Sequence, residues 1–508
     1  EIEGRSCHGA YPSQGVDAIV TACGIVTTLQ SVISRNIDSR DSAVLSFGKI
    51  VGGEKNMRER FFKLRDKLLN TTPKICIERA KIVTEAYKKY DAYPNIEKRA
   101  MALADVLRNM TIYIEEEQLL AGNQASSNRA APLFPEYAFA YILDELDDLE
   151  KRSSDKFTIT EEDKKVLREI LPWWEGKTLK DRAIAMQPQE VLDDRVTGVL
   201  GWQGNVSTGE GHIVPDYDMV VRLGFAGLRD KIQKHMDELD LSKPQDLEKL
   251  TFYRACKAII DGCLDYIKRY CTLAKEQAEQ CEDAVRKEEL SGISQRCQAL
   301  LERAPETFFE ALQCVWFVQV ILHIETNGHS LSFGRFDQYM NPFLQKDLKE
   351  GRITMEEAEE MLGCFYLKIY SNNKLRSWSN TLTQMGSPTY QNICLGGQKA
   401  DKTDAVNEMS WLCLEMLDEI RLPEPTMYIR VHENISEAFL KRAVKIVKQG
   451  VGMPAFVNDQ TIIPALERRC NKRGLMELLH HGLYRSSGTG QMGISCKRKE
   501  QDQSLKDT

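Results

Sequence analysis

The chain has 508 residues, of which 42% are hydrophobic and 28% are charged, and its formal net charge is −7. This length suffices for about three average domains, or for one large α/β barrel with additions. The composition is typical of a globular protein, and the acidic balance argues against nucleic-acid binding, which usually needs a basic stripe. The sequence contains no run of about 18 apolar residues, so it predicts no membrane span. The first residues lack the basic and then apolar pattern of a secretion signal.

The 14 cysteines are scattered and form no Cys-x-x-Cys pair. A zinc site needs paired spacings, so we expect no bound metal. Scattered cysteines are typical of buried thiols in a reducing compartment, and we therefore expect a cytoplasmic protein. The chain starts at Glu1 without a methionine, which favours a fragment or a processed chain.

Three segments of the chain differ in character. Residues 1–56 have the strand and turn composition of a small α/β fragment. Residues 57–474 alternate amphipathic helical patterns with short strand candidates, which predicts a helix-rich α/β barrel-like core. Residues 475–508 have little periodicity and end in a polar run, which predicts disorder.

The expected helices share a long, periodic apolar face, and they are Arg58–Leu69, Lys74–Tyr90, Glu97–Met110, Glu161–Ile170, Leu247–Lys287, Ala304–Ile324, Thr354–Tyr370 and Glu437–Lys448. Capping patterns at Thr160 and Thr354 mark two of the helix starts. The expected strands are short apolar runs between them, at Tyr113–Ile114, Leu119–Leu120, Asn392–Leu395, Thr426–Val431 and Ala455–Val457.

The most informative stretch of the chain is Glu325–Tyr339, which reads ETNGHSLSFGRFDQY. It directly follows the long apolar segment Phe308–Ile324 and places a histidine, serines, an arginine and an aspartate within a few residues. Polar groups delivered at the end of a buried element are how a scaffold builds a ligand pocket. The sequence therefore predicts a binding site at this point.

Residues 57–474 resemble the glycyl radical enzymes of the pyruvate formate-lyase superfamily. The resemblance rests on ETNGHSLSFGRFDQYMNPF and on several further segments in the same order along the chain. These are NTTPKICIERA from Asn70, LAGNQ from Leu120, STGEGHIVPDY from Ser207, GGQ from Gly396, RLPEP from Arg421, RVH from Arg430 and GMPAFVND from Gly452.

The resemblance implies a ten-stranded α/β barrel, usually a homodimer, that encloses a finger loop with a cysteine in Gly-Cys-x-Glu. It also implies a C-terminal glycine that a separate radical S-adenosylmethionine activase converts to a backbone radical, with no other bound cofactor. The radical passes to the cysteine thiol, which then takes hydrogen from an unreactive C–H bond of the substrate. A closed barrel keeps such radicals away from water and oxygen.

Within this resemblance we assign substrate-binding roles to His212, Asp216, His329, Ser330 and Asn458. His329 and Ser330 are the preferred pair, because a neutral imidazole can hold a proton that leaves or joins a hydroxyl and the serine can orient it. This position lines the substrate pocket of relatives that dehydrate diols and glycerol. His212 lies in a glycine-bearing loop, where a backbone-bonded role is the alternative. Asp216 has helix capping as its alternative, and Asn458 has a turn role.

Four further polar residues are expected to serve structure. Arg335 and Asp337 are expected to form a buried pair, while His323 and His432 lie in apolar surroundings and are expected in the core.

The Asn-Gly-His-Ser element favours a dehydratase-like lyase acting on a small diol or polyol. A formate acetyltransferase would carry adjacent cysteines, and this chain has none. Decarboxylases of aryl acetates and choline trimethylamine-lyases share much of the framework and stay open as alternatives. A non-catalytic barrel that binds a ligand is a further alternative.

The chain departs from the family pattern after Gly474. No Gly-Cys-x-Glu follows, and the Arg-Val-x-Gly pattern of the glycyl loop is missing. We therefore expect the thiyl cysteine and the radical glycine to be absent and the chain to be inactive as written. One permitted codon choice for Met476–Cys496, read one base later, encodes Gly-Cys-Ile-Glu. This leads to the hypothesis of a frameshift near residues 474–477.

Residues 1–56 resemble instead the small dimerisation domain of metal-dependent amidohydrolases that cleave N-acyl amino acids. The resemblance rests on EGRSCHGAYPSQGVDAI from Glu3 and on GKIVGG from Gly48. It implies that His8 helps to hold a substrate. The metal-binding half of such an enzyme is absent, so we expect neither zinc nor hydrolysis.

Overall fold

The computed structural model describes residue 25 and residues 57–197, 206–383, 389–399 and 401–467. The chain divides into two compact units, Glu1–Arg60 and Phe61–Thr508. The expectations for residues 1–56, including His8, and for residues 475–508 fall outside the described residues. The second unit contains the segment Glu325–Tyr339, in which the sequence predicts a binding site.

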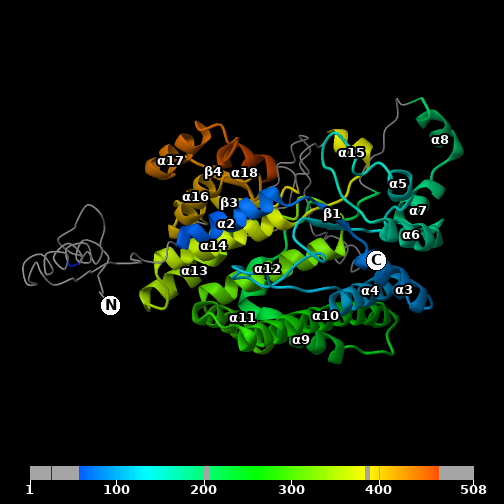
Figure 1. Ribbon diagram of the computed structural model, residues 1–508, viewed down its shortest axis with the longest axis horizontal. Helices are drawn as coiled ribbons and strands as arrows, with labels where there is room; N and C mark the ends of the chain where they lie inside the picture. Colours follow the sequence, from blue (N-terminus) through cyan, green and yellow to red (C-terminus); the bar gives the residue numbers. More distant parts are fainter. Residues whose placement is uncertain (1–24, 26–56, 198–205, 384–388, 400, 468–508) are drawn as a thin grey trace, which may run out of the picture. The chain divides into compact units, whose positions relative to one another are not determined.

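Helices make up most of the described chain (Figure 1). Their bounds are α2 Met57–Asn70, α3 Glu78–Lys89, α4 Asn95–Asn109, α5 Ala140–Asp144, α6 Glu161–Ile170, α7 Leu179–Ala185, α8 Gln189–Arg195, α9 Tyr217–Asp237, α10 Pro244–Gln280, α11 Ala284–Glu302, α12 Phe308–Glu325, α13 Phe336–Lys349, α14 Met355–Ser371, α15 Trp378–Thr383, α16 Glu408–Ile420, α17 Glu437–Val447 and α18 Asp459–Glu467. A short 3-10 helix, η2, spans Leu171–Trp174. The long helix α10 packs along α4, α9 and α11, and α12 lies between this group and α13 and α14.

The described strands form two parallel sheets. In one, β1 (Lys74–Cys76) pairs with β2 (Ala130–Pro132); in the other, β3 (Asn392–Gly396), β4 (Thr426–Val431) and β5 (Ala455–Asn458) lie in chain order. Parallel neighbours need crossover connections. The helices α16 and α17 supply them, which fits the expected helix-rich α/β fold.

The second sheet continues beyond β3 into the segment that carries the expected site. The Phe333 N–H donates to the Asn392 carbonyl at 2.8 Å, and the Cys394 N–H donates to the Gly334 carbonyl at 2.8 Å. The residues after His329 thus run alongside β3, in the manner of an extra strand. The site segment is therefore fixed to the edge of a sheet.

The strands β3, β4 and β5 confirm the sequence prediction, but three other assignments were wrong. Lys74–Cys76 is a strand and not the first turn of a helix, because it pairs with Ala130–Pro132, more than fifty residues away. The expected strands Tyr113–Ile114 and Leu119–Leu120 are irregular chain. The expected helix Leu247–Lys287 is two helices, because Asp283 caps a new start and accepts from the Arg286 N–H at 2.7 Å.

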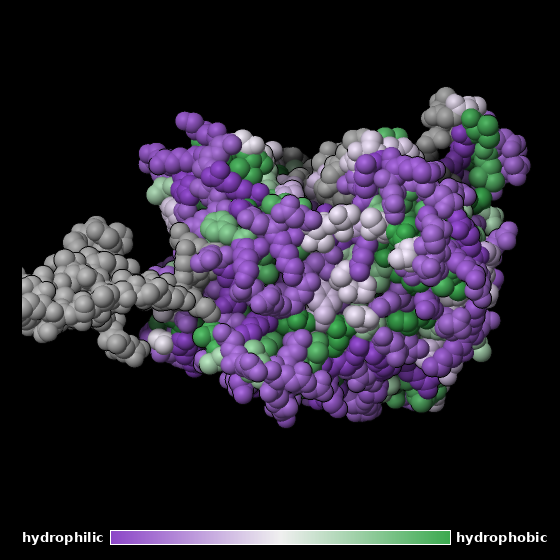
Figure 2. All heavy atoms as spheres, viewed as in Figure 1, coloured by the Kyte–Doolittle hydropathy of each residue, from purple (hydrophilic) through white to green (hydrophobic). Residues whose placement is uncertain are grey.

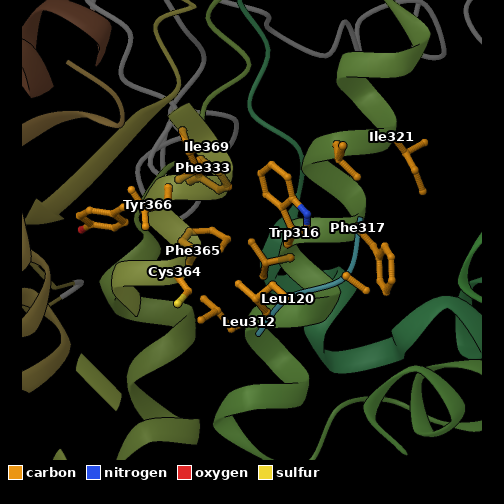
Figure 3. Close-up of a cluster of buried hydrophobic side chains, with 14 of the residues drawn as sticks. Leu120, Leu312, Trp316, Phe317, Ile321, Phe333, Cys364, Phe365, Tyr366 and Ile369 are labelled. Carbon is orange, nitrogen blue, oxygen red and sulfur yellow. The ribbon is translucent and has the colours of Figure 1, made fainter. Parts of the chain in front are cut away.

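The core is centred on α12, which is buried on nearly all sides. Figure 3 shows Leu312 and Trp316 of this helix beside Phe365 and Cys364 of α14, while Phe317 points to the opposite side, where it meets Tyr266 and Tyr270 of α10. A helix that is apolar all round belongs in the centre of a large protein. The core thereby holds α12 rigidly, so that its C-terminal end is a firm base for the residues that come after it.

On the face that Figure 2 shows, hydrophilic residues predominate and apolar residues are interspersed among them. Among the described residues, α12 is the one helix that is long and apolar enough to cross a membrane. It lies 78% buried inside the protein, as expected of a core helix.

Candidate active site

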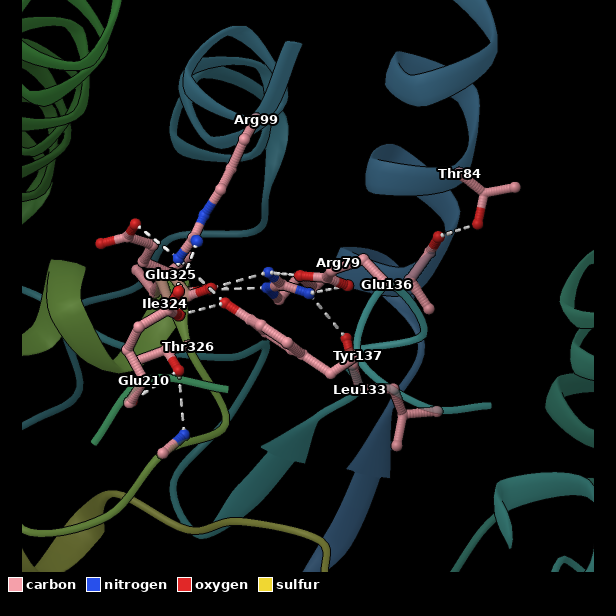
Figure 4. A network of polar contacts seen from close by, with 12 residues as sticks. Arg79, Thr84, Arg99, Leu133, Glu136, Tyr137, Glu210, Ile324, Glu325 and Thr326 are labelled. Carbon is pink, nitrogen blue, oxygen red and sulfur yellow. Dashed lines mark hydrogen bonds and ion pairs between the residues drawn. The ribbon is translucent and has the colours of Figure 1, made fainter. Parts of the chain in front are cut away.

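The C-terminal end of α12 is held by two buried cations. The Arg79 guanidinium donates to the carbonyls of Ile324 at 2.6 Å and Glu325 at 3.1 Å, and it pairs with Glu136 (Figure 4). The Lys374 ammonium donates to the carbonyls of His323 and Thr326, both at 2.6 Å. Cations at a helix C-terminus satisfy its unpaired carbonyls and complement its dipole. The chain therefore leaves α12 in a fixed direction.

A loop that includes residues 206–213 packs directly on the segment that leaves α12. The His212 N–H donates to the His329 carbonyl at 2.8 Å. Two glycines permit this approach, because a Cβ on Gly328 would lie 1.6 Å from the Glu210 carbonyl oxygen and one on Gly211 would lie 2.5 Å from the His329 carbonyl oxygen. Glycine is required wherever two backbones come this close.

An exposed ionic network anchors the same loop from the other side. Arg99 of α4 grips the Glu210 carboxylate with two hydrogen bonds of 2.7 and 2.8 Å and also bonds Glu325 and the Tyr137 hydroxyl (Figure 4). The fork of a guanidinium matches a carboxylate in this way. Its hydrogen bonds to Glu210 lower the pKa of that carboxyl to about 2.

The structure brings His212 and His329 into direct contact. Their Nε2 atoms are 3.1 Å apart, and their ring centroids are 4.5 Å apart at an angle of 68°. Both residues come from irregular chain, and His212 has a φ of 63°. A left-handed backbone at a residue other than glycine costs free energy and is found at functional sites. The two predicted histidines thus form one unit.

The protons of this pair can be assigned from its surroundings. Burial, helped by the charge of Arg376, lowers the pKa of His329 to about 4, so its ring is neutral at pH 7. The Nδ1 atom of His212 is buried without a hydrogen-bond partner among the described residues. A buried N–H without an acceptor is rarer than a buried lone pair without a donor. We therefore assign the shared proton to His212 Nε2, which leaves the proton of His329 on Nδ1.

Ser330 is buried beside this pair, and its φ of 60° is again left-handed. The Ser330 N–H donates to the Thr389 carbonyl at 2.7 Å. The residue is thus fixed between the histidine pair and the chain that enters β3. The substrate-binding role of Ser330 stays a prediction.

Asp216 and Asn458 lie in local capping positions. Asp216 is the N-cap of α9 and accepts from the Met219 N–H at 2.9 Å. Asn458 is exposed at the end of β5 and accepts from the Gln460 N–H at 2.9 Å. Because Ser330 adjoins Thr389 ahead of β3, it lies at the opposite edge of the sheet from Asn458. The structure therefore brings His212, His329 and Ser330 together and separates Asn458 from them.

The expected structural residues are buried, but their pairing differs from the prediction. Arg335 and Asp337 form no ion pair among the described residues; both instead bond Gly396, the first to its carbonyl and the second to its N–H. Each leaves one side-chain atom without a described partner. The buried ion pair of this region joins Arg430 to Asp459, with bonds of 2.7 and 3.0 Å.

His323 and His432 are buried, as expected. The surroundings of His432 are not wholly apolar, because its Nε2 lies 3.2 Å from the Asp404 carboxylate.

Sequence reasoning missed the cations that surround the site. Arg376 donates to the Asn327 carbonyl and faces His329 closely enough to lower its pKa. Burial lowers the pKa of Arg376 itself to about 10 and that of Lys374 well below its usual value. The available signal in the sequence was the pair of basic residues Lys374 and Arg376, which are two positions apart.

No group of three or more metal-ligating side chains occurs within the described ranges. The described cysteines form no disulfide with one another, and none belongs to a Gly-Cys-x-Glu sequence. Those buried among apolar side chains, such as Cys263, Cys314 and Cys413, have raised pKa values. The sequence pattern therefore assigns none of them the role of the radical-carrying thiol.

The family description "Pyruvate formate lyase-like" matches residues 56–478, and the chain belongs to this family.

Comparison with individual proteins shows which members of this family the chain is similar to. The chain is 38% identical over 396 residues to "Probable dehydratase YbiW" of Escherichia coli, a match that covers 77% of this chain and 49% of the relative. It is similar to the glycerol-bound B12-independent glycerol dehydratase from Clostridium butyricum, with a TM-score of 0.79, 34% identity and coverage of 83% and 53% of the two chains. A glycyl radical enzyme from Archaeoglobus fulgidus matches with a TM-score of 0.77, 33% identity and coverage of 82% and 54%.

These relatives place the chain among the glycyl radical enzymes, and the two that are named for an activity are dehydratases. The chain spans about half the length of the relatives it matches.

Proposed function

We propose that this chain forms the substrate-binding half of a carbon–oxygen lyase that dehydrates a small diol or polyol. The observation that carries the proposal is the contact between His212 and His329 at 3.1 Å beside the buried Ser330. The relative of known structure with glycerol bound supports a polyol as the ligand class. Asp216 stays in the proposal as a substrate-binding residue, and Asn458 does so only if the substrate extends across the sheet.

The proposed roles follow from the protons of the pair. Among the described residues no side chain accepts the Nδ1 proton of His329, and a hydroxyl oxygen of a bound diol can accept it. Loss of a hydroxyl group as water builds negative charge on the leaving oxygen, and the Nδ1–H of a neutral imidazole can donate a hydrogen bond that stabilises this charge. Ser330 orients the same hydroxyl.

The glycyl radical of this family supplies hydrogen abstraction from an unreactive C–H bond. The described residues hold neither of its carriers, so the proposal assigns to this chain only binding, orientation and a hydrogen bond to the leaving oxygen. A radical-activating enzyme and a second copy of the chain are proposed partners, and the cytoplasm is the proposed location. Residues 57–474 are the proposed barrel domain, with residues 1–56 and 475–508 outside it.

A non-catalytic ligand-binding barrel is the second candidate. It is favoured by the absence of Gly-Cys-x-Glu from the whole sequence.

Calorimetric titration with 1,2-propanediol and glycerol tests the binding role that both candidates share. We expect saturable binding that His329→Gln weakens about tenfold, which corresponds to the loss of one hydrogen bond. The matched control is His235→Gln, because His235 stacks on Tyr253 at the surface and belongs to no site. Equal affinity of wild type and His329→Gln would contradict the proposal.

A further inference from the structure

Glu424 is a buried carboxylate that makes no ion pair among the described residues. It lies two residues ahead of β4 and is 5% exposed. Its Oε1 accepts from the Tyr390 N–H at 2.6 Å and its Oε2 accepts from the Gln391 N–H at 2.9 Å. A carboxylate that grips two successive backbone N–H groups fixes the local backbone by charge-assisted hydrogen bonds.

The backbone that Glu424 grips is strained and adjoins the site. Tyr390 has a φ of 50°, in the left-handed region that side chains other than glycine rarely adopt. Its neighbour Thr389 accepts the N–H of Ser330, and the Tyr390 ring lies 6.2 Å from the His329 ring. A conformation of this kind persists only where its surroundings enforce it. Glu424 is the described group placed to enforce it.

The other side of the turn is tied to the same segment. The Gln391 side chain donates to Thr389 Oγ1 at 2.9 Å and accepts from Gln319 at 3.0 Å. The Gln319 amide also donates to the Leu331 carbonyl at 2.8 Å. The Thr389–Gln391 turn and the segment after His329 are therefore held as one body, and a change of the turn must displace Ser330.

We propose that Glu424 is a positioning residue whose carboxylate holds the Thr389–Gln391 turn in the shape that places Ser330 and His329 for a diol. The inference rests on the proposed function only for the identity of the ligand, a diol. The effect of Glu424 on the geometry of the two histidines can be measured without any ligand. Glu424 acts through the turn and does not touch the substrate.

The grip depends on the charge of Glu424. Burial raises the pKa of this carboxyl to about 7, so it changes charge in the neutral range. Protonation turns one acceptor oxygen into a donor that faces a backbone N–H. The charged or titratable groups that face it are Arg129 and Tyr390; burial lowers the pKa of Arg129 and raises that of Tyr390.

The test combines two readouts on the full chain labelled with 15N-histidine. Imidazole nitrogen shifts in the NMR spectrum report the Nε2–Nε2 contact, and titration with 1,2-propanediol gives the affinity. Glu424→Gln keeps the shape of the side chain. It places an amide NH2 group, which is a donor, against one of the two backbone N–H groups, which are donors as well. The matched control is Glu415→Gln, because Glu415 pairs with Arg442 on the surface of α16.

We expect Glu424→Gln to shift the His329 nitrogens and to weaken diol binding about tenfold, while Glu415→Gln does neither. The wild type should show the same two changes on acidification from about pH 8.5 to 6, and this arm needs no substitution if the variant does not fold. Unchanged His329 shifts in both arms would overturn the inference. If the shifts change but no diol binds at any pH, the positioning role stands and the proposed function fails.

Discussion

At the scale of the residue, the site is built from groups held in states they would not adopt alone. His329 is kept neutral by burial and by Arg376, and His212 and Ser330 occupy left-handed backbone. Such strain is retained because Arg79 and Lys374 fix the end of α12 by hydrogen bonds and the glycines of the loop let the two backbones pack closely. The result is a pair of imidazoles that shares one proton in a buried setting.

The lowered pKa of His329 makes stability depend on pH. Its folded pKa of about 4 lies below the unfolded value of 6.5, so the unfolded state binds the extra proton more tightly. The contribution of neutral His329 to the unfolding free energy is complete above about pH 6.5. It is lost as the pH falls toward 4, and the loss is at most about 3 kcal/mol. Denaturant unfolding at about pH 7 and pH 5 checks this. His329→Gln should lose less stability on acidification than His235→Gln; equal losses would contradict it.

Gly328 should tolerate no side chain. Gly328→Ala is expected to cost about 3 kcal/mol or more of unfolding free energy, because its Cβ overlaps the Glu210 carbonyl and pushes the two site segments apart. Gly292→Ala in α11 is the control, since its Cβ would come no closer than 3.2 Å to another residue, at the Arg296 guanidinium, and alanine favours a helix. Urea unfolding of both variants measures the difference. A Gly328→Ala protein as stable as wild type would show that the two backbones are not in contact.

At the scale of the element, the end of α12 depends on a buried ion pair. Arg79 is 6% and Glu136 11% exposed, and the same guanidinium bonds three backbone carbonyls. It also stacks on the Phe134 ring at 3.8 Å. Breaking such a pair strands a buried charge, which costs far more than losing a pair at the surface.

Arg79→Met is therefore expected to lower the unfolding free energy by about 3–5 kcal/mol. Arg108→Gln should cost less than about 1 kcal/mol, because the ion pair of Arg108 with Asp265 is exposed. Chemical denaturation of the two variants gives the comparison. Similar small costs would mean that Arg79 does not fix the end of α12.

The sequence predicted those elements whose signals are local. The helix at Glu161–Ile170 was found because Thr160 caps it, and the structure shows this cap bonded to the Asp163 N–H. β1 was missed because its pairing with residues 130–132 is invisible in its own three residues. Glu424 was missed as a candidate for the same reason, since its partners Tyr390 and Gln391 lie more than thirty residues away.

At the scale of the whole molecule, the proposed binding site stands in a chain without the Gly-Cys-x-Glu sequence that the family resemblance implies for radical chemistry. Gly-Cys-x-Glu is absent throughout the 508 residues. We therefore expect no dehydration product from the chain, even with a radical-activating enzyme and a reductant. Gas chromatography of such a mixture under anaerobic conditions checks this. Turnover above the level of a heat-treated sample would contradict it.

The frameshift hypothesis makes a separate prediction about the gene. The DNA from the codon of Gly474 onward should, when read one base later, encode Gly-Cys-Ile-Glu and then continue toward a glycyl-radical loop. Sequencing the locus several hundred bases past the codon of Thr508 settles the matter. A shifted frame without these sequences would rule the hypothesis out.

The most direct test is a crystal structure of the chain grown with glycerol. A glycerol hydroxyl is expected within about 3 Å of His329 Nδ1, beside Ser330, with the contact between His212 and His329 retained. Glycerol found only elsewhere, or two histidines that do not meet, would contradict the assignment of this site as the place where a polyol binds.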